Sequence, residues 1–455
     1  MKYLSTRDNS LKKSFDKILY QGLSNEGGLY LPVEWPSINL SNLENKSYEE
    51  VALEIIFPFV KENLSKLDLK EILNESYANF RHEKKAPIKE LESNKYILEL
   101  IYGPTYAFKD YALQFLGELF ASSLAKNPKK ITVLGATSGD TGSAAIHAFK
   151  SNQNINVFIL HPHGKVSPIQ QKQMTSIQEE NIFNIAIDGN FDDCQKIVKE
   201  LFVDSDIQNL TSLTAINSIN WARLIAQVVY YFWSYLQIKN KEINFIVPSG
   251  NFGNIFSAYV AKKMGLPINR LHIATNTNDI LKSIIKTGKM EKKLVSQTFS
   301  PSMDIQISSN FERQMFESFN RDSNEVKKAF DEFNKTGNYT FESKIIKGFN
   351  DIYDASSIND HETLDTIAKV YEKYDYISDP HTATGLNILM NKKQDETWVS
   401  LVCAHPAKFN DAVKKAIKKE IDIPKELSNL FDKEEKMTIL SNSTQEVKNY
   451  IIRNI

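Results

Sequence analysis

Short apolar segments alternate with amphipathic segments from about residue 96 to residue 285. Each apolar segment is rich in Ile, Val or Phe and is followed by a polar loop and then by helical spacing of apolar residues. Strands that alternate with helices in this way predict a doubly wound, mostly parallel α/β sheet. The strand candidates are KKITVL, INVFILHP, NIFNIAID, INFIVP and RLHIATNTN, with a last one, WVSLVCAHP, before the helical segment NDAVKKAIKKE.

Residues 1–95 and the residues after 285 have a different pattern from this alternation of strands and helices. Residues 1–95 contain a hairpin-like turn at 25–28 and helical stretches such as YEEVALEIIFPFVKENL, which predicts a mainly helical N-terminal domain. Residues 286–375 are more polar and helical, so we expect an insertion that packs on the sheet. The central α/β region then runs from 96 to 425, and residues 426–455 predict a charged helical tail.

Composition narrows the class of protein. A chain of 455 residues has room for two or three domains, and a formal net charge of −1 argues against a nucleic-acid partner. The two cysteines are far apart, which excludes a disulfide framework. No secretory signal is recognised, and no apolar run approaches the roughly 20 residues that cross a bilayer. We therefore expect a cytoplasmic protein, in which the apolar cluster 228–236 forms a buried helix.

Lys109 is the most informative residue. It stands between a Gly-Pro turn and a predicted helix whose apolar positions are Leu113, Leu116, Phe120 and Leu124. An ammonium at a helix N-terminus faces the positive end of the helix dipole, and burial disfavours its charge further. A lysine that is easily neutral can form a Schiff base with an aldehyde cofactor and then move protons. The plain alternative is a surface lysine that opens a helix.

Three loops beyond predicted strands have the composition of ligand loops, and ligands bind at this end of strands in open α/β sheets. Residues 136–142 (ATSGDTG) place glycines and hydroxyls directly before a helix, which suits a carboxylate or a phosphate. Residues 248–254 (PSGNFGN) have glycines that let backbone amides surround a phosphate, without the Walker or GxGxxG pattern. Residues 403–409 (CAHPAKF) follow the last strand. His405 could be a structural histidine, which is the commoner role of a lone histidine, and Cys403 could be a plain core residue.

A lysine able to form an imine, a loop for a cofactor phosphate and a second anion loop together fit pyridoxal phosphate. Longer blocks carry a family resemblance: GPTYAFKDYALQ, ATSGDTGSAA, HPHGKVSPIQQKQM, NSINWARLIAQ, VPSGNFGNIFSAYVAKKMGLP, SPSMDIQISSNFER, DPHTATG and HPAKF. In these blocks the chain resembles the threonine synthases, which are fold-type-II pyridoxal-phosphate enzymes of the tryptophan synthase β superfamily. The match covers most of the chain, from GGLYLP to HPAKF.

The resemblance implies a fold and a set of residue roles. The fold has doubly wound, mostly parallel sheets in two α/β subdomains after a mainly helical N-terminal domain. The resemblance implies that Lys109 is the catalytic residue and carries the cofactor, and that no metal is needed. It assigns further cofactor contacts to Gly250, Asn251, Phe252, Gly253, Asn254 and Cys403. It assigns the substrate α-carboxylate to the loop Thr137, Ser138, Gly139, Asp140, Thr141 and Gly142.

The implied activity is that of a lyase that releases phosphate from O-phospho-L-homoserine and adds water at the β-carbon, giving L-threonine. The freed Lys109 amine would remove the α-proton, and Asp110 is expected to hold backbone N–H groups as a helix cap. A dianionic leaving group needs donors, and for Arg223 a structural salt bridge is an equal alternative. The candidate donors, by closeness to the motifs, are Lys165, Ser167, Asn217, Ser218, Asn220 and Arg223.

The chain departs from the family pattern at two positions. Cys403 stands where the family usually has the threonine that faces the pyridine nitrogen, and a thiol is a weak hydrogen-bond partner. Either the weaker contact suffices, or Thr382 or a water takes that role. Tyr106 stands where an aliphatic residue is more usual. We expect His161 and His163 to be structural or solvent-facing.

Two other functions stay open at this point. A phospholyase or a threonine/serine dehydratase with the same cofactor would share the lysine and the glycine loops but release a keto acid. A nucleotide-binding module would explain the strand–loop–helix units alone, although its phosphate motifs are absent from the sequence. The expected partner is a small-molecule substrate, with neither nucleic acid nor membrane, and the expected assembly is a monomer or a homodimer.

Overall fold

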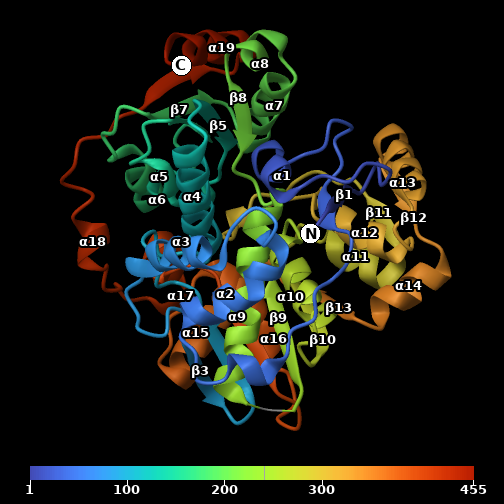
Figure 1. The fold of residues 1–455 in the computed structure, drawn as a ribbon. Helices are drawn as coiled ribbons and strands as arrows, with labels where there is room; N and C mark the ends of the chain where they lie inside the picture. Colours follow the sequence, from blue (N-terminus) through green and yellow to red (C-terminus); the bar gives the residue numbers. More distant parts are fainter. Residues whose placement is uncertain (240) are drawn as a thin grey trace.

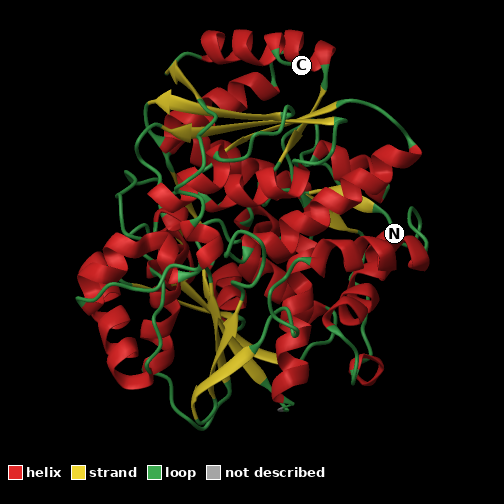
Figure 2. Cartoon of the chain, turned by 90° about the vertical axis from the view of Figure 1, so that its left-hand side faces the viewer, coloured by secondary structure: helices red, strands yellow, loops and turns green. Residues whose placement is uncertain are grey.

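Two parallel sheets organise the chain, and a layer of helices lies between them (Figures 1 and 2). The computed structural model describes residues 1–239 and 241–455. The smaller sheet has the strand order β15-β7-β6-β5-β8, and all its strands are parallel. Its strands are β5 (Ile131–Ala136), β6 (Ile155–Pro162), β7 (Ile182–Asp188), β8 (Ser212–Ala215) and β15 (Thr438–Ser441).

The larger sheet has the order β13-β10-β9-β14-β4-β3, and only the edge strand β3 runs antiparallel to its neighbour. The predicted α/β class with two mostly parallel sheets is therefore confirmed. Its strands are β3 (Ile88–Glu92), β4 (Lys95–Glu99), β9 (Ile243–Pro248), β10 (Ile268–Thr275), β13 (Tyr353–Ser357) and β14 (Trp398–Val402).

The N-terminal region combines helices with a small hairpin. Strands β1 (Tyr3–Ser5) and β2 (Tyr30–Pro32) pair antiparallel, and the predicted turn at 25–28 lies just before β2, closed by a bridge between Leu23 and Leu29. Helix α2 (Tyr48–Val60) begins with a capping box in which Ser47 and Glu50 satisfy each other's backbone N–H groups. The other elements are α1 (Phe15–Gln21), η1 (Leu40–Leu43) and α3 (Lys66–Ala78).

The helices between the sheets form the main core. Helix α4 (Lys109–Lys126) packs against α5 (Asp140–Phe149) and α9 (Trp221–Ile238). The predicted buried helix at 228–236 lies within α9, where residues from Trp221 to Phe232 are all buried. The remaining helices of this part are α6 (Pro168–Thr175), α7 (Phe191–Phe202), α8 (Ser205–Leu210), α10 (Gly253–Lys263) and α11 (Ile280–Thr287).

The segment 286–375 is mostly helical, but it also supplies strands. A hairpin of β11 (Lys289–Glu291) and β12 (Asn338–Thr340) accompanies the helices, and β13 extends the larger sheet beside β10. The helical elements here are η2 (Pro301–Met303), α12 (Phe311–Ser318), α13 (Ser323–Thr336), α14 (Ser343–Asn350) and α15 (Asp360–Tyr374).

The C-terminal tail crosses from the larger sheet to the smaller one. After α16 (Pro380–Met390) and β14, the chain passes through η3 (Pro406–Phe409), α17 (Asn410–Ile417) and α18 (Lys425–Ser428). Strand β15 then pairs in parallel with β7, and α19 (Thr444–Arg453) packs on α7. The tail is therefore not only helical, because it contributes an edge strand to the small sheet.

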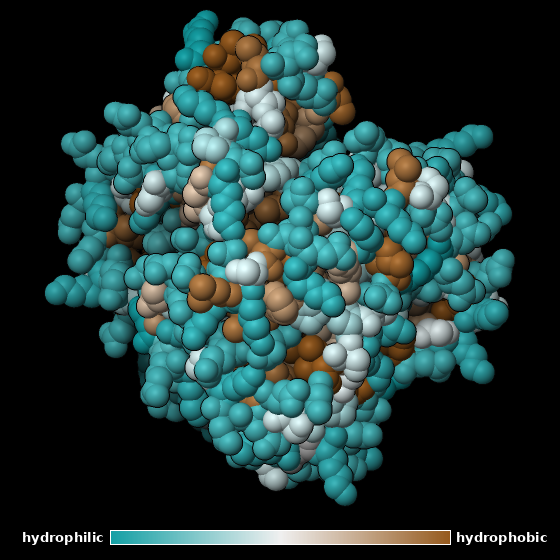
Figure 3. All heavy atoms as spheres, in the orientation of Figure 1, coloured by the Kyte–Doolittle hydropathy of each residue, from teal (hydrophilic) through white to brown (hydrophobic). Residues whose placement is uncertain are grey.

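Hydrophilic residues cover most of the face shown in Figure 3, with hydrophobic residues scattered among them. Among the helices of the described residues, none combines the length and the apolar character that crossing a bilayer requires.

Candidate functional site

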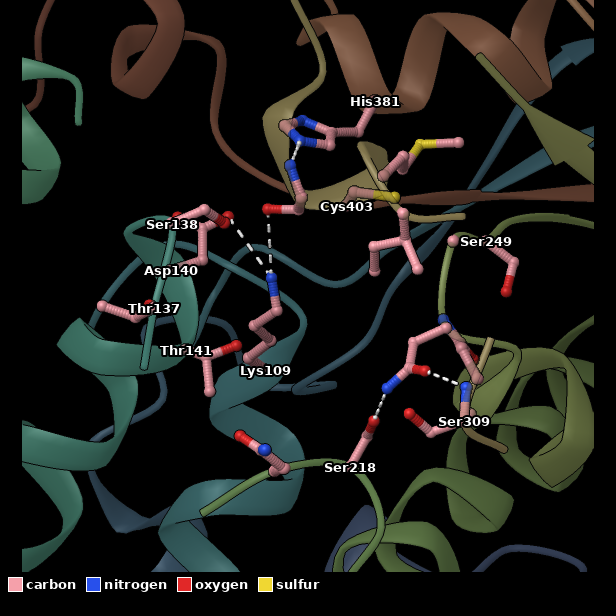
Figure 4. A pocket seen from close by; sticks show the side chains of 18 of the residues that line it. Lys109, Thr137, Ser138, Asp140, Thr141, Ser218, Ser249, Ser309, His381 and Cys403 are labelled. Carbon is pink, nitrogen blue, oxygen red and sulfur yellow. Dashed lines mark hydrogen bonds and ion pairs between the residues drawn. The ribbon is translucent and has the colours of Figure 1, made fainter. Parts of the chain in front are cut away.

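The main pocket, about 200 Å³ in volume, is lined by segments from both sheets. The loops that follow β5, β9 and β14 all reach it, as do the start of α4 and one face of α9. The three loops singled out in the sequence therefore meet at one place (Figure 4). The lining residues include Lys109, Thr137, Ser138, Asp140, Thr141, Asn217, Ser218, Arg223, Gln227, Ser249, Gly250, Asn251, Gly253, Asn254, Ser302, His381 and Cys403.

Lys109 is the first residue of α4, as the apolar spacing predicted. The turn before it is held against the segment after β14, because Phe108 N–H donates to Cys403 O at 2.9 Å and His405 N–H donates to Tyr106 O at 2.9 Å. Tyr106 adopts a positive φ of 62°, which only this bracing makes tolerable. The backbone directly before the lysine is thus held against the segment that follows β14.

The Lys109 amine is largely buried and points toward Asp140 (Figure 4). Its side chain is 12% exposed, and its Nζ lies 3.9 Å from Asp140 Oδ2 and 3.3 Å from Ser302 Oγ. Burial lowers the pKa of Lys109, the Asp140 carboxylate opposes that shift, and the positive charges of Arg223 and Lys408 lower the pKa further. A lysine with a lowered pKa is available as a nucleophile and as a base.

Asp110 braces the turn rather than capping the helix. Its carboxylate accepts from Thr105 N–H at 2.8 Å and from Thr105 Oγ1 at 2.7 Å, whereas α4 has no side-chain cap. The prediction that Asp110 holds a backbone N–H group is confirmed, although that group precedes the helix. Gly103 allows this close approach, since a Cβ there would lie 2.3 Å from Asp110 Cβ.

We expect Gly103→Ala to lower the free energy of unfolding by about 1–3 kcal/mol, because Asp110 would have to move and release Thr105. Gly348→Ala in α14 is the matched control, since nothing lies within 4 Å of its Cβ position and alanine favours a helix. Urea unfolding of both variants tests this. Equal effects of the two substitutions would contradict the role given to Gly103.

The loop 136–142 opens α5 and exposes hydroxyls to the pocket. Thr137 Oγ1 accepts from Gly139 N–H at 3.0 Å and Gly142 N–H at 2.9 Å, so it shapes the loop. Gly139 has a φ of 134°, and a Cβ there would lie 2.4 Å from Gln170 Cδ. Ser138 and Thr141 line the pocket at the start of a helix, where unpaired N–H groups favour an anion.

The loop 248–254 opens α10 in the same way. Phe252 is in the left-handed conformation, its ring is buried among other aromatic rings, and it is not among the lining residues of the pocket, unlike Gly250, Asn251, Gly253 and Asn254. A Cβ at Gly250 would lie 2.9 Å from Met303 Cα, which keeps this position small. The Asn251 side chain bridges Ser218 Oγ at 2.6 Å and Ser309 N–H at 2.7 Å (Figure 4).

Buried polar atoms beside this loop lack partners within the chain. Arg223 Nε, Gln227 Oε1 and Asn254 Nδ2 are buried without a hydrogen-bond partner among the described residues, and all three side chains line the pocket. Burial lowers the pKa of Arg223 to about 10, and none of the described carboxylates forms an ion pair with it. The two donors, Arg223 Nε and Asn254 Nδ2, suit an anionic ligand, whereas Gln227 Oε1 suits a ligand that donates a hydrogen bond. A phosphate-bearing cofactor with a lysine-reactive aldehyde supplies the anion.

Cys403 lines the pocket with a neutral thiol, because burial raises its pKa. Thr382, the alternative partner for a pyridine nitrogen, is engaged elsewhere: its hydroxyl accepts from Cys403 N–H at 2.8 Å and donates to Asp379. It is also not among the lining residues. Of these two residues, Cys403 is therefore the one that lines the pocket.

Several expected ligands do not reach the pocket. Lys165 is exposed, and Ser167 is the N-cap of α6, where its hydroxyl accepts from Gln170 N–H. Asn220 is the N-cap of α9 and donates to Leu19 O at 2.9 Å. Asp140, by contrast, does line the pocket, but its carboxylate is paired with Lys109 and Lys408. A carboxylate is a poor partner for a substrate carboxylate, because the two negative charges repel each other. 

Four residues that the sequence did not single out complete the site. Ser302 N–H donates to His381 Nε2 at 3.2 Å, which leaves His381 Nδ1–H to donate to Asp379 Oδ1 at 2.9 Å. Lys408 Nζ lies 2.7 Å from Asp140 Oδ1. All four stand in blocks that carry the family resemblance, SPSMD, DPHTATG and HPAKF, which is the signal that pointed to them.

The two histidines of β6 and its following loop are outside the pocket, as expected. His163 is exposed and its Nδ1 lies 2.9 Å from Asp188 Oδ1. His161 is fully buried, neither ring nitrogen has a partner among the described residues, and burial lowers its pKa to about 4.

Replacing His161 by leucine is expected to make stability less sensitive to acid. The unfolded chain binds a proton at this residue below about pH 6.5 and the folded chain only below about pH 4. Stability is therefore lost as the pH falls through this window, by an amount on the order of 3 kcal/mol from His161. Urea unfolding at pH 7 and pH 5 measures the part of this loss that falls between those two pH values, about 2 kcal/mol. The same difference in stability in His161→Leu as in the wild type would contradict the assignment.

Comparison with known sequence families divides the chain into three matches. Residues 2–77 match the family "Threonine synthase N terminus" and residues 382–451 match "Threonine synthase, C-terminal". Residues 82–340, more than half of the chain, match "Pyridoxal-phosphate dependent enzyme".

Similar proteins agree with these matches over the full length. The threonine synthase of Pseudomonas aeruginosa is 42% identical, with 99% of this chain and 98% of the relative covered, and that of Saccharomyces cerevisiae is 40% identical, with 99% and 97% covered. The crystal structure of PLP-bound threonine synthase from Brucella melitensis has a TM-score of 0.95 at 43% identity, with 100% of this chain and 99% of that chain covered. The chain therefore belongs to the threonine synthase family of pyridoxal-phosphate-dependent enzymes.

Proposed function

We propose that this protein is a threonine synthase, which converts O-phospho-L-homoserine and water to L-threonine and phosphate with pyridoxal phosphate as cofactor. The observation that carries the proposal is the buried Lys109 amine, which faces a pocket bounded by two helix N-termini and by polar atoms without partners. A cofactor that binds lysine and a phosphate-bearing substrate together account for these features.

The residues around Lys109 suit this cofactor. When bound, pyridoxal phosphate supplies an aldehyde that joins an amino group and a ring that withdraws electrons from the adjoining carbon. The backbone of Gly250, Asn251, Phe252, Gly253 and Asn254 would hold its phosphate, as a helix N-terminus holds anions. Cys403 would contact its ring nitrogen as a neutral, weak partner.

Lys109 is assigned the proton transfers. Its lowered pKa makes the amine a base, and Ser302 Oγ and Asp140 keep it in one place while it takes a proton from the α-carbon and then from the β-carbon. The bond between the γ-carbon and oxygen breaks, and phosphate leaves with that oxygen. The hydroxyl of water joins the β-carbon. The three protons released by the α-carbon, the β-carbon and water go to the γ-carbon, which becomes the methyl group of threonine, to the α-carbon, and to the departing phosphate.

The ends of the substrate are anionic, and the pocket offers each a cationic or N–H-rich group. Ser138, Thr141 and the N-terminus of α5 would bind the α-carboxylate. Arg223 and Asn217 would bind the leaving phosphate, since Arg223 brings a buried charge with no carboxylate to neutralise it.

We also propose the division of the chain and its setting. Residues 1–95 form the N-terminal domain, 96–425 the catalytic region with an insertion at about 286–375, and 426–455 the tail. The protein works in the cytoplasm as a monomer or a homodimer, in keeping with two free cysteines.

The test is to incubate the purified protein with O-phospho-L-homoserine and measure phosphate, threonine and 2-oxobutyrate in one reaction. We expect threonine and phosphate in equal amounts. Phosphate with 2-oxobutyrate in place of threonine would identify a phospholyase or dehydratase, and the absence of all three products would refute the assignment.

A further inference from the structure

Lys408 is a fully buried lysine that the proposed reaction does not use. It lies in η3 after β14, its side chain has no exposed surface, and its Nζ is 2.7 Å from Asp140 Oδ1 and 2.8 Å from Thr105 O. Burying an ammonium is costly unless it is paired and hydrogen-bonded. Asp140 and Thr105 O therefore offset the large desolvation cost of the Lys408 ammonium.

The contacts of Lys408 connect three segments that build the site. Thr105 belongs to the turn that presents Lys109, Asp140 begins α5 after the loop of the small sheet, and Lys408 itself follows a strand of the large sheet. Thr105 O also accepts from Gln173 Nε2 at 3.0 Å. Lys408 thus ties the catalytic turn to the loop 136–142.

Asp140 is shared between two lysines. Its Oδ1 accepts from Lys408 and from Gln170 Nε2 at 2.8 Å, while its Oδ2 lies 3.9 Å from Lys109 Nζ (Figure 4). Because the Lys408 contact is the shorter one, most of the carboxylate charge is already balanced before Lys109 is counted. A single carboxylate cannot fully neutralise two buried ammonium groups.

We propose that Lys408 is a positioning residue for the reaction: it holds Asp140 beside Lys109 and balances the Asp140 charge, so that Lys109 is oriented without being locked in an ion pair. The inference rests on the proposed function only in naming Lys109 as the reactive amine.

The charges around Lys109 support this reading. Besides Asp140 of α5 and Lys408 of η3, the groups that face it are Arg223 of α9 and Cys403 at the end of β14. Burial alone would raise the pKa of Asp140, but the Lys408 and Lys109 charges hold it well below its ordinary value. Without Lys408, the Asp140 carboxylate would have Lys109 as its nearest cation and would raise the pKa of that amine.

The experiment measures the ionisation of the Lys109 amine directly. The full chain, freed of cofactor, is labelled with trace acetic anhydride across a pH series, and peptide mass spectrometry gives the labelling midpoint of Lys109. In Lys408→Met we expect the midpoint to rise by about 1 pH unit or more, which is about tenfold slower labelling below the midpoint. In Asp140→Asn we expect it to fall, and in the double variant to return near the wild-type value.

Lys95→Met is the matched control. Lys95 is also buried, with Glu92 Oε2 at 3.2 Å and Met390 O at 3.0 Å, but it is the first residue of β4 and does not line the pocket. Its loss should leave the Lys109 midpoint unchanged. Lys408→Arg, which keeps the charge, should shift the midpoint less than Lys408→Met and should lower kcat more than it changes KM.

An unchanged midpoint in folded Lys408→Met overturns the proposal, as does an equal shift in Lys95→Met. If Lys408→Met does not fold, Asp140→Asn is compared with the double variant, in which removal of the Lys408 charge should raise the midpoint. No difference between those two also overturns it. Labelling does not depend on turnover, so a wild-type protein that makes no threonine would refute the proposed function without deciding this inference.

Discussion

Lys109→Ala is expected to abolish threonine formation, with a loss of about four orders of magnitude or more, and to remove the absorbance of the imine between lysine and cofactor while leaving the fold intact. The substitution deletes both the amine that joins the cofactor and the base that moves protons at the substrate. Lys408, whose amine shares Asp140 with Lys109, cannot take over either role, because it is bonded to Asp140 and to Thr105 O. Absorbance spectra of the purified variant and assays of threonine and phosphate measure the effect.

Lys126→Ala is the control for this prediction. Lys126 lies in the last turn of the same helix, where it is exposed and forms an ion pair with Asp68 at 2.8 Å. Such surface pairs contribute less than about 1 kcal/mol, so cofactor binding and turnover should stay as in the wild type. A Lys109→Ala variant that keeps its cofactor absorbance and its activity would show that another amine carries the reaction.

The position of Lys109 could be predicted because its signals are local. The Gly-Pro turn and the apolar spacing of α4 lie within a few residues of it, and the structure begins the helix at that residue. The parallel strands β5, β6, β7, β9, β10 and β14 were predictable for the same reason, since buried parallel strands are continuous apolar runs.

Edge strands were harder to predict. Strand β15 pairs with β7 through its backbone, but its side chains alternate between exposed and half-buried, so the sequence TILS carries no strong apolar signal. Strand β13 joins β10 from within a polar, helical segment. In both cases the pairing depends on a neighbour far along the chain, which periodicity does not report.

The site shows the same limit. Lys165 and Ser167 were chosen because they stand near a motif in sequence, yet Lys165 is exposed, Ser167 caps α6, and neither residue lines the pocket. Lys408 is the opposite case: the sequence did not single it out, although it lies beside Asp140 and Thr105 in the structure. These partners come from segments that only the folded chain brings together.

Arg223→Met is expected to raise KM for O-phospho-L-homoserine by about 30-fold or more while leaving the fold intact. Truncating one member of a buried, hydrogen-bonded charge pair costs about 2–5 kcal/mol in binding, and 1.4 kcal/mol corresponds to a factor of ten. In the free protein the Arg223 guanidinium contacts Ile216 O and none of the carboxylates among the described residues, so its removal relieves the cost of a buried charge. Loss of the hydrogen bond to Ile216 O lowers the free energy of unfolding by about 1 kcal/mol, which offsets part of the stability gained by removing the buried charge.

The matched control is Arg313→Met, because Arg313 is also fully buried but is absent from the lining of the pocket. Its guanidinium donates to Tyr30 O at 3.0 Å and to Ile219 O at 2.6 Å, so it ties two segments of the fold together. We expect this variant to lose about 2–4 kcal/mol of unfolding free energy with KM unchanged, the reverse of Arg223→Met. If Arg223→Met lost stability and kept its KM, Arg223 would be a structural residue, and the leaving phosphate would have to be held by other donors of the pocket.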